Sequence, residues 1–301
     1  MAHGIAIKSS KQQKLKRLGV IFESLGDTFS YVELKDIAKV EFDFFFQHGI
    51  KKPTRNNNEF YETLEQHEKP VLIREAAPIR ELEIKNTAGK TPIEDQWMRL
   101  SWNSFYMDDG IHPFDPSYSR WNELKKEYNL QVEDWKRRGD NIIFNLQKTA
   151  DSALNRLYYN DIDYKFFVIE KINEIQKYTD RPIIIRPHPK DLKLLEWLKE
   201  QNLNVTFSDM RPFKEDLDRA WCLITYNSTT CVESTLYGTP TCVLDPSAVS
   251  WEVSQQSIAE IENDHDVDRD SWLEKIAFMQ WKGSEFKNGY AWKLLKDSIN
   301  L

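Results

Sequence analysis

Residues 220–245 decide the fold, and they read AWCLITYNSTTCVESTLYGTPTCVLD. An apolar run from Trp221 to Tyr226 ends in the polar turn Asn227-Ser228-Thr229-Thr230, and a short helical pattern follows. Gly238 and Pro240 end that helix, and a second apolar run begins directly afterwards. We therefore predict a strand–helix–strand unit whose polar turn lies at the carboxyl end of a strand. Free backbone N–H groups and the helix dipole favour an anion there.

The composition is that of a soluble globular protein. Of 301 residues, 40% are hydrophobic and 30% are charged, which suits one large domain or two ordinary ones. No window is apolar over the length that a bilayer requires, and the first residues lack the pattern of a signal peptide. The three cysteines lie in or beside apolar runs without paired spacing, so we expect buried thiols in a cytoplasmic protein. An isoelectric point near 5.5 does not indicate a nucleic-acid partner.

The first half of the chain alternates short strands and helices, which indicates α/β layers. We place the end of this first domain at residue 138, after a charged helical stretch that Gly139 breaks. The expected strands are Gly4–Lys8, Gly19–Glu23, Val40–Phe46, Pro70–Arg74 and Trp97–Trp102, and the expected helices are Phe29–Ala38 and Glu59–Glu68.

Three stretches of the first half have the position or composition of a site. The first is 74–80, directly after a strand, where Glu75 is our candidate for a general base. An ion pair with Arg74 or Arg80 explains Glu75 equally well. The second stretch, 101–104, also follows a strand and contains Asn103.

The third stretch is the long irregular segment 108–121. Long irregular segments in compact domains are often functional, so Asp108, Asp109 and His112 are further candidates for the base. The alternatives are a turn made by the two aspartates with Gly110, and a surface position for His112, which we favour over a catalytic one.

The second half predicts a doubly wound parallel sheet, from the order β-α-β-α-β-(short helix)-β-α-β. A buried strand at 141–146 is followed by Gln147, and an amphipathic helix at 163–178 has Phe166, Ile169, Ile172 and Ile175 at intervals of three. The next strand ends in Arg186-Pro187-His188-Pro189-Lys190, a concentrated positive charge that suits a phosphate. An ordinary surface turn is the alternative.

Two acidic features have competing explanations. Glu233 completes a capping box with Thr230, and it could instead accept the hydroxyls of a nucleotide ribose. The acidic run at 260–270 contains one histidine, so a metal site is conceivable, but a solvated loop before a helix explains it better.

The two motifs RPHPK and YNSTTCVESTLYGTP, taken together, resemble the capsule polysaccharide biosynthesis family of glycosyltransferases and its phage-encoded relatives. The likeness extends over most of residues 70–295, including Gln147, the tail QWKGSEFKNGYAW and the region of Arg80, Asn103 and Arg120-Trp121. The chain departs from the family pattern at Cys231, where a small residue is usual, and at Ser234, where alanine is usual.

This resemblance implies a GT-B-type α/β fold, in which two Rossmann-like domains face each other across a cleft. Residues 1–138 would bind the acceptor, residues 139–301 would bind the nucleotide sugar, and the terminal helices would pack back on the first domain. The implied donor-binding residues are Gln147, Arg186, His188, Lys190, Asn227, Ser228, Thr229, Thr230 and Glu233, and the implied acceptor-binding residues are Arg80, Asn103 and Arg120.

The expected function is therefore transfer of a sugar from a nucleotide-activated donor, a UDP-sugar or else a CMP-sugar, to an acceptor hydroxyl. No metal or other cofactor is required in this scheme, because basic side chains and a helix N-terminus supply the positive charge. The shortness of the first half and its phage-like region favour 5-hydroxymethylpyrimidine in double-stranded phage DNA as acceptor, in the host cytoplasm. The alternatives are a cell-surface polysaccharide acceptor, an epimerase on the same fold, and a non-catalytic protein that binds sugar nucleotides or nucleic acid.

Overall fold

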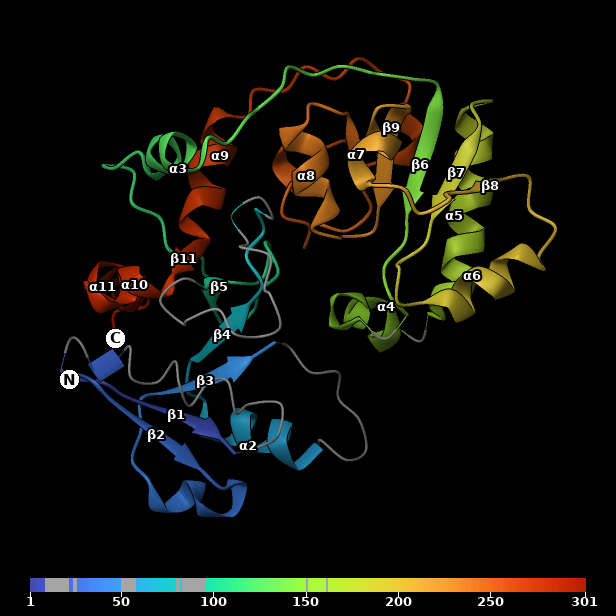
Figure 1. The fold of residues 1–301 in the computed structure, drawn as a ribbon. Coiled ribbons are helices and arrows are strands. Elements are labelled where there is room, and N and C mark those ends of the chain that lie inside the picture. The colour runs from blue at the N-terminus through green and yellow to red at the C-terminus, as the bar shows by residue number, and fades with distance from the viewer. Residues whose placement is uncertain are drawn as a thin grey trace. The chain divides into compact units, whose positions relative to one another are not determined.

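The structure is a computed structural model that describes residues 1–8, 22–23, 26–49, 58–79, 82, 96–149, 151–160 and 162–301. The chain divides into two compact units. Unit 1 contains residues 1–130 and 273–301, and unit 2 contains residues 131–272. Both are α/β units, as expected from the alternating pattern, and Figure 1 shows the elements of each.

Unit 1 contains a six-stranded sheet of order β11-β5-β4-β3-β1-β2. Strands β2, β1, β3 and β4 are parallel, whereas β5 is antiparallel to β4, and β11 is antiparallel to β5. The strands are β1 (His3–Ile7), β2 (Thr28–Val32), β3 (Phe44–His48), β4 (Val71–Glu75), β5 (Trp97–Trp102) and β11 (Gln280–Lys282). The helices are η1 (Leu34–Lys39), α2 (Asn58–His67), α3 (Arg120–Tyr128), α10 (Gly283–Lys287) and α11 (Tyr290–Asp297), and α9 (Asp270–Phe278) starts in unit 2 and ends in unit 1.

The sheet of unit 1 is apolar on both faces. Successive side chains of a strand point to opposite sides, and β3 contains apolar residues at successive positions. Phe44 and Phe46 contribute to one cluster, together with Trp102, Trp281 and other buried aromatic side chains. Phe45 points the other way and packs in a second cluster. The sequence prediction of a helix over Phe29–Ala38 is wrong, since β2 and the 3-10 helix η1 occupy this stretch. Of the strand predicted at Gly19–Glu23, only residues 22–23 are described, and they are helical.

Unit 2 contains a five-stranded, fully parallel sheet of order β10-β9-β6-β7-β8. The strands are β6 (Asn141–Asn145), β7 (Ile183–Arg186), β8 (Thr206–Phe207), β9 (Ala220–Thr225) and β10 (Thr241–Val243). The helices are η4 (Ser152–Leu154), α4 (Asn155–Tyr159), α5 (Tyr164–Tyr178), α6 (Leu192–Lys199), α7 (Phe213–Leu217), α8 (Thr230–Leu236), η5 (Trp251–Val253) and η6 (Ile258–Glu260). This is the doubly wound sheet that the sequence predicts.

The apolar runs of unit 2 are continuous because both faces of a parallel sheet are covered. Ile142 and Phe144 pack on one face, in the cluster that includes α5, and Ile143 packs on the other with Leu217. The predicted apolar face of α5 is confirmed in part: Ile172 and Ile175 are buried and Ile169 packs against the core, whereas Phe166 is 66% exposed.

The passage from unit 1 to unit 2 lies between Leu130 and Gln131, earlier than the boundary expected at residue 138. The reason is that the segment 131–138 is bonded to unit 2. The amide of Glu133 donates to the carbonyl of Leu236, that of Lys136 to Gly238, and that of Arg138 to Ala220. At the other end of the chain, β11 pairs with β5 and so belongs to unit 1.

Candidate functional site

The winding direction of the unit 2 sheet reverses between β6 and β9. The chain runs outward from β6 to β7 and β8, and then returns to the opposite side of β6 to form β9 and β10. In doubly wound sheets, ligands bind at the carboxyl ends of the strands beside such a switch point. Figure 1 shows that the chain leaves the arrowhead of β6 toward α4, so the loops after β6, β7 and β9 define the candidate site.

The loops after β6 and β9 are fastened to each other by amide side chains. Asn145 Nδ2 donates to Thr230 Oγ1 at 3.0 Å. Gln147 Nε2 donates to Asn227 Oδ1 at 2.8 Å, and the backbone N–H of Asn227 donates to Gln147 Oε1 at 3.2 Å. Gln147 and Asn227 are both buried, so these two predicted donor-binding side chains hold the loops in place in this structure.

A second layer of polar side chains supports Asn227 from β10. Asn227 Nδ2 donates to Ser247 Oγ at 2.7 Å and to the carbonyl of Ala153 at 2.9 Å. Asp245, just after β10, accepts from Tyr226 Oη at 2.7 Å and from the amide of Ser247 at 2.9 Å. Sequence reasoning missed Asp245 and Ser247, although their position directly after a strand is the signal that identified the other loops.

The hydroxyl-rich turn remains partly open to solvent. Ser228, Thr229, Thr230 and Glu233 are half-buried. Helix α8 begins at Thr230, its N-cap is Thr229, and the Thr229 side chain makes no capping hydrogen bond. The capping arrangement therefore differs from the predicted one, in which Thr230 is the cap.

Arg186 does not contribute its charge to the strand-end loops as expected. Its Nη1 bonds Asp216 and the carbonyl of Arg211, the latter at 3.0 Å. Asp216 has a fully buried side chain and also accepts from Arg219 Nη2 at 2.8 Å and from Ser208 Oγ at 2.8 Å. A buried carboxylate requires such partners, so Arg186 serves to neutralise Asp216.

His188 and Lys190 lie at the start of the loop after β7, where the sequence predicts them. The amide of Lys190 donates to His188 Nδ1 at 3.1 Å. In the neutral ring the proton is therefore on Nε2, which can act as a donor. His188 is half-buried, whereas Lys190 and the neighbouring-loop Lys148 are exposed.

Asp191 joins this loop to the loop after β6. Its Oδ2 accepts from both the amide and the hydroxyl of Thr149, each at 2.7 Å, and its Oδ1 accepts from the amide of Leu194. Burial by itself raises the pKa of Asp191, but the hydrogen bonds from Thr149 and Leu194 outweigh it and hold the pKa below its usual value. The three loops are thus connected by side-chain bonds, and Lys148, His188 and Lys190 are their cationic or donor groups.

In unit 1, Glu75 ends β4 at the carboxyl edge of the parallel strands. Its Oε2 accepts from the amide of Ala76 at 3.2 Å, and a Cβ placed on Gly49 would lie 2.8 Å from its Oε1. Beside it, His48 at the end of β3 is opposite Arg74, with His48 Nδ1 3.0 Å from the Arg74 carbonyl. Sequence reasoning did not select His48.

Asn103 lies at the opposite end of the strands of this sheet, where the parallel strands begin. Strand β5 is antiparallel, so its carboxyl end meets the beginning of β4, where Asn103 Oδ1 accepts from the amide of Val71 at 3.1 Å. Asn103 and Glu75 therefore lie at opposite ends of the strands of this sheet, although each directly follows a strand in the sequence.

His112 is a packed histidine. Its Nε2 donates to the carbonyl of Tyr106 at 3.1 Å, and its Nδ1 is buried without a partner. Burial and then the nearby Arg99 lower the pKa of His112 to about 3, which makes it a weak base at neutral pH. Asp108 and Asp109 are exposed in the turn before it.

Arg120 has a structural role. It is 3% exposed, forms a two-bond ion pair with Glu285 at 2.5 and 2.9 Å, and donates to the carbonyls of Ala277 and Gln280. Its guanidinium also lies 4.1 Å from the ring centre of Trp281. These contacts occupy the guanidinium N–H groups that would be needed to bind an acceptor substrate. Arg80, the other predicted acceptor contact, lies outside the described residues.

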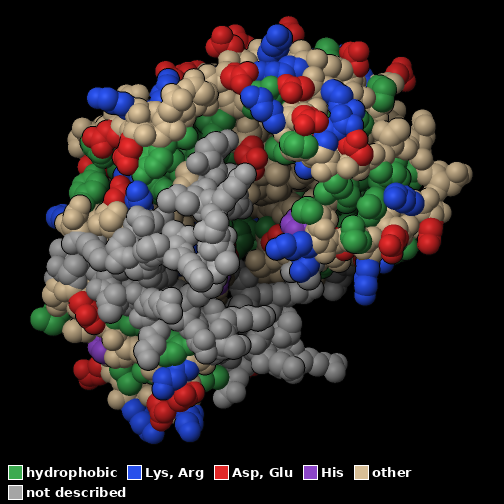
Figure 2. Space-filling model, viewed as in Figure 1, with side chains coloured by type: hydrophobic (Ala, Val, Ile, Leu, Met, Phe, Trp, Pro, Cys, Tyr) green, Lys and Arg blue, Asp and Glu red, His purple; other side chains and the backbone are tan. Residues whose placement is uncertain are grey.

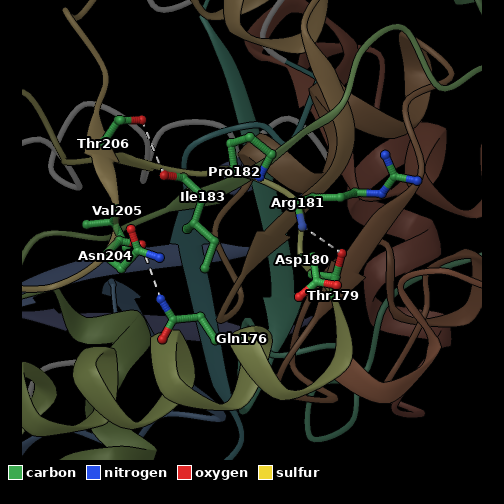
Figure 3. Close-up of a pocket in the computed structure, with 9 residues that line it drawn as sticks. All are labelled: Gln176, Thr179, Asp180, Arg181, Pro182, Ile183, Asn204, Val205 and Thr206. Atoms are coloured by element: carbon green, nitrogen blue, oxygen red, sulfur yellow. Dashed lines mark hydrogen bonds between the residues drawn. The ribbon is translucent and has the colours of Figure 1, made fainter.

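A groove of about 580 Å³ lies at the opposite end of the unit 2 sheet (Figure 3). It is formed beside the amino ends of β7 and β8, and Gln176 spans part of it by donating to the carbonyl of Asn204 at 3.1 Å. Parallel sheets bind ligands at the carboxyl ends of their strands, so this groove is not the candidate site.

Within the described ranges, no group of three or more His, Cys, Asp or Glu side chains is placed to hold a metal ion, and no helix is long and apolar enough to cross a membrane.

Two solved structures are similar to this chain. One is KpsC, beta Kdo 2,4 transferase, from Thermosulfurimonas dismutans, with a TM-score of 0.58, 12% identity, and coverage of 92% of this chain and 89% of that one. The other is KpsC, beta Kdo 2,7 transferase, from the same organism, with a TM-score of 0.56 and the same identity and coverage. No protein-family model matches the sequence, and no curated protein matches it. The likeness shows a fold of the GT-B glycosyltransferase type.

Proposed function

We propose that this protein is a glycosyltransferase that uses a nucleotide sugar, with the donor bound at the carboxyl edge of the unit 2 sheet. The observation that carries the proposal is that side-chain bonds join the three loops at the switch point, from Asn145 to Thr230 and from Thr149 to Asp191. These loops contain Lys148, His188, Lys190 and the hydroxyls of residues 228–230. Unit 1 would then bind the acceptor. The fold is in accord with this assignment, since the similar structures are transferases of a sugar.

The chemistry of the loops suits a leaving nucleotide. As the bond between sugar and phosphate breaks, negative charge grows on the phosphate oxygens. His188 Nε2 and the two lysine ammonium groups can donate hydrogen bonds to those oxygens, and the three hydroxyls can do the same without a further charge. Glu233, half-buried one turn into α8, is proposed to accept the ribose hydroxyls.

For the acceptor we propose a saccharide hydroxyl, with Glu75 as the group that removes its proton; in support, the two similar structures are named as Kdo transferases. The DNA acceptor expected from phage-like residues has no support in the structure. Arg120 is held in a buried ion pair, and Asn103 lies at the wrong edge of the sheet. On the face shown in Figure 2, Lys and Arg side chains of unit 2 are interspersed with Asp and Glu and form no basic stripe.

The test is a binding and turnover assay with a panel of UDP- and CMP-sugars. Wild-type protein is expected to bind one of these nucleotides and to release it when a saccharide acceptor is supplied. His188→Ala should weaken nucleotide binding by tenfold or more, about 1.4 kcal/mol, because it removes a charge-assisted donor. Lys193→Ala, on the exposed surface of α6, is the matched control. Equal affinity of the His188→Ala variant and wild type would refute the phosphate role, and binding of nucleotide without any transfer would favour a non-catalytic binding protein.

A further inference from the structure

Asn155, the first residue of α4, has a side chain that the fold itself does not satisfy. The residue is 1% exposed, and among the residues that the structure describes neither its Oδ1 nor its Nδ2 has a hydrogen-bond partner. Buried amides are nearly always paired, because leaving one unpaired costs stability. An exception of this kind calls for a partner that is not part of the chain.

The residues on either side of Asn155 attach its segment to the candidate donor site. The carbonyl of Ala153 accepts from Asn227 Nδ2 at 2.9 Å. Arg156 Nη1 lies 3.3 Å from Asp245 Oδ1, and Asp245 also accepts from Tyr226. Asn155 is thus held between the loop after β9 and the end of β10, although none of its own side-chain atoms participates in that network.

The chemistry of the side chain narrows the choice of partner. A phosphate has acceptors only, so it could pair with Nδ2 but would leave Oδ1 unpaired. A nucleobase edge has a donor and an acceptor side by side in one plane, and a carboxamide matches both.

We propose that Asn155 recognises the nucleoside part of the donor by pairing with the edge of its base. This inference rests on the proposed function, because it takes the donor site to be at the switch point. The amide is covered in the present structure, so the contact includes a shift of the segment 151–160 when the nucleotide enters. Asn155 is then a specificity-determining residue that the fold leaves unpaired for the ligand.

The experiment compares full-length wild type with Asn155→Leu, which has nearly the same shape and no polar atoms. Affinities for UMP, CMP and pyrophosphate are measured by calorimetry, and the melting temperature is measured without ligand. We expect the affinity for the preferred nucleotide to fall tenfold or more, that for pyrophosphate to change less than twofold, and the melting temperature to stay equal or rise. Asn173→Leu, at an exposed position of α5, is the matched control.

Two results would overturn the inference. One is nucleotide affinity within twofold of wild type together with a lower melting temperature, which is the signature of an amide paired with internal water. The other is an equal loss of pyrophosphate affinity. If Asn155→Leu does not fold, Asn155→Asp, which retains the shape and loses the two donors, must show the same selective loss. Wild-type protein that binds none of the three probes would refute the proposed function and this inference with it, whereas normal binding by both variants refutes the inference alone.

Discussion

At the scale of single residues, the strand-end side chains divide into those that hold the loops and those that can meet a ligand. Arg186, Gln147 and Asn227 are committed to partners within unit 2. In the described part of the chain, the side chains of His188 and Lys190 take no part in such a network, apart from the bond from the Lys190 amide that orients the imidazole. The sequence alone could not show that Arg186 holds the loops and does not meet a ligand, because its ion-pair partner Asp216 lies 30 residues further along the chain.

Arg120 provides a test of a structural against a functional role. Replacing it with alanine leaves Glu285 without its ion-pair partner and removes the contact with Trp281, so we expect a loss of about 3–5 kcal/mol in the free energy of unfolding. Urea titration measures this loss. Lys126→Ala, at an exposed position of α3, should change stability by less than about 0.5 kcal/mol. A variant Arg120→Ala that is as stable as wild type but inactive would restore the acceptor-binding assignment.

The lowered pKa of His112 predicts that the free energy of unfolding depends on pH. Its folded pKa of about 3 lies below the unfolded value near 6.5, so the unfolded chain binds a proton that the folded chain does not. The stability is therefore intact above pH 6.5 and falls by up to about 1.4 kcal/mol per pH unit between pH 6.5 and 3. Unfolding of His112→Gln at pH 7.5 and 5.5 should show a smaller decrease than wild type. Equal decreases would mean that the imidazole is accessible to protons in the folded state.

At the scale of elements, unit 2 follows from the sequence far better than unit 1. Four strands of unit 2, β6, β7, β9 and β10, are short and mostly buried runs followed by turn residues, which is the pattern expected for a parallel sheet covered on both faces. The sequence contains no comparable signal for the antiparallel direction of β5, because that direction depends on the strands with which β5 pairs. The same is true of β11, whose Trp281 pairs with Met98 from far along the chain. The predicted face of α5 is confirmed at Ile169, Ile172 and Ile175 but is wrong at Phe166, because intervals of three drift around a helix of 3.6 residues per turn and carry this side chain outward.

The attachment of α11 to the rest of unit 1 depends on Asp27. Its carboxylate accepts from Trp292 Nε1 at 2.6 Å, Lys296 Nζ at 2.6 Å and the amide of Ala2 at 2.7 Å. Burial by itself raises its pKa, but the bonds from Lys296, Ala2 and Trp292 outweigh this effect and lower the pKa below 3.8. The stabilisation is therefore complete above about pH 4 and is lost as pH falls through the lowered folded pKa.

We expect Asp27→Asn to destabilise unit 1 by about 1.5–3 kcal/mol at pH 7, as is usual for the loss of hydrogen bonds to a charged group. Thermal unfolding at pH 7 checks this value. Asp297→Asn, on the same helix as Trp292 but exposed, is the comparison. Unchanged melting of Asp27→Asn would show that the aromatic packing of Trp292 holds α11 without the carboxylate.

The turn after α8 requires a glycine. Gly238 has a φ of +71°, and a Cβ at this position would lie 2.1 Å from the carbonyl oxygen of Asp134. Gly238→Ala should therefore cost several times the roughly 1 kcal/mol of an unhindered left-handed position, since the segment 131–138 has to move away. Gly26→Ala, where φ is +76° and no atom of the described residues lies within 4 Å, isolates the cost of the backbone conformation. Similar unfolding energies for the two variants would show that the segment adjusts at no cost.

At the scale of the whole molecule, unit 2 is one continuous stretch of chain, whereas unit 1 is assembled from two. The fragment 131–272 contains all five strands of its sheet and both clusters that cover it. We expect this fragment to fold by itself with a cooperative thermal transition and to bind the same nucleotide as the full chain. Circular dichroism and calorimetry test this, and a fragment without a transition would show that unit 2 depends on unit 1.

The discontinuity of unit 1 has a consequence for biosynthesis. A ribosome makes β1 to β5 before unit 2, whereas β11, which borders β5, and α11, whose Leu295 carbonyl accepts from Trp102, are made after unit 2. During translation, unit 2 can therefore reach its native state while the aromatic side chains of unit 1 are still uncovered. Chaperone binding and protease cleavage during synthesis should concentrate on residues 1–130 until the tail has emerged.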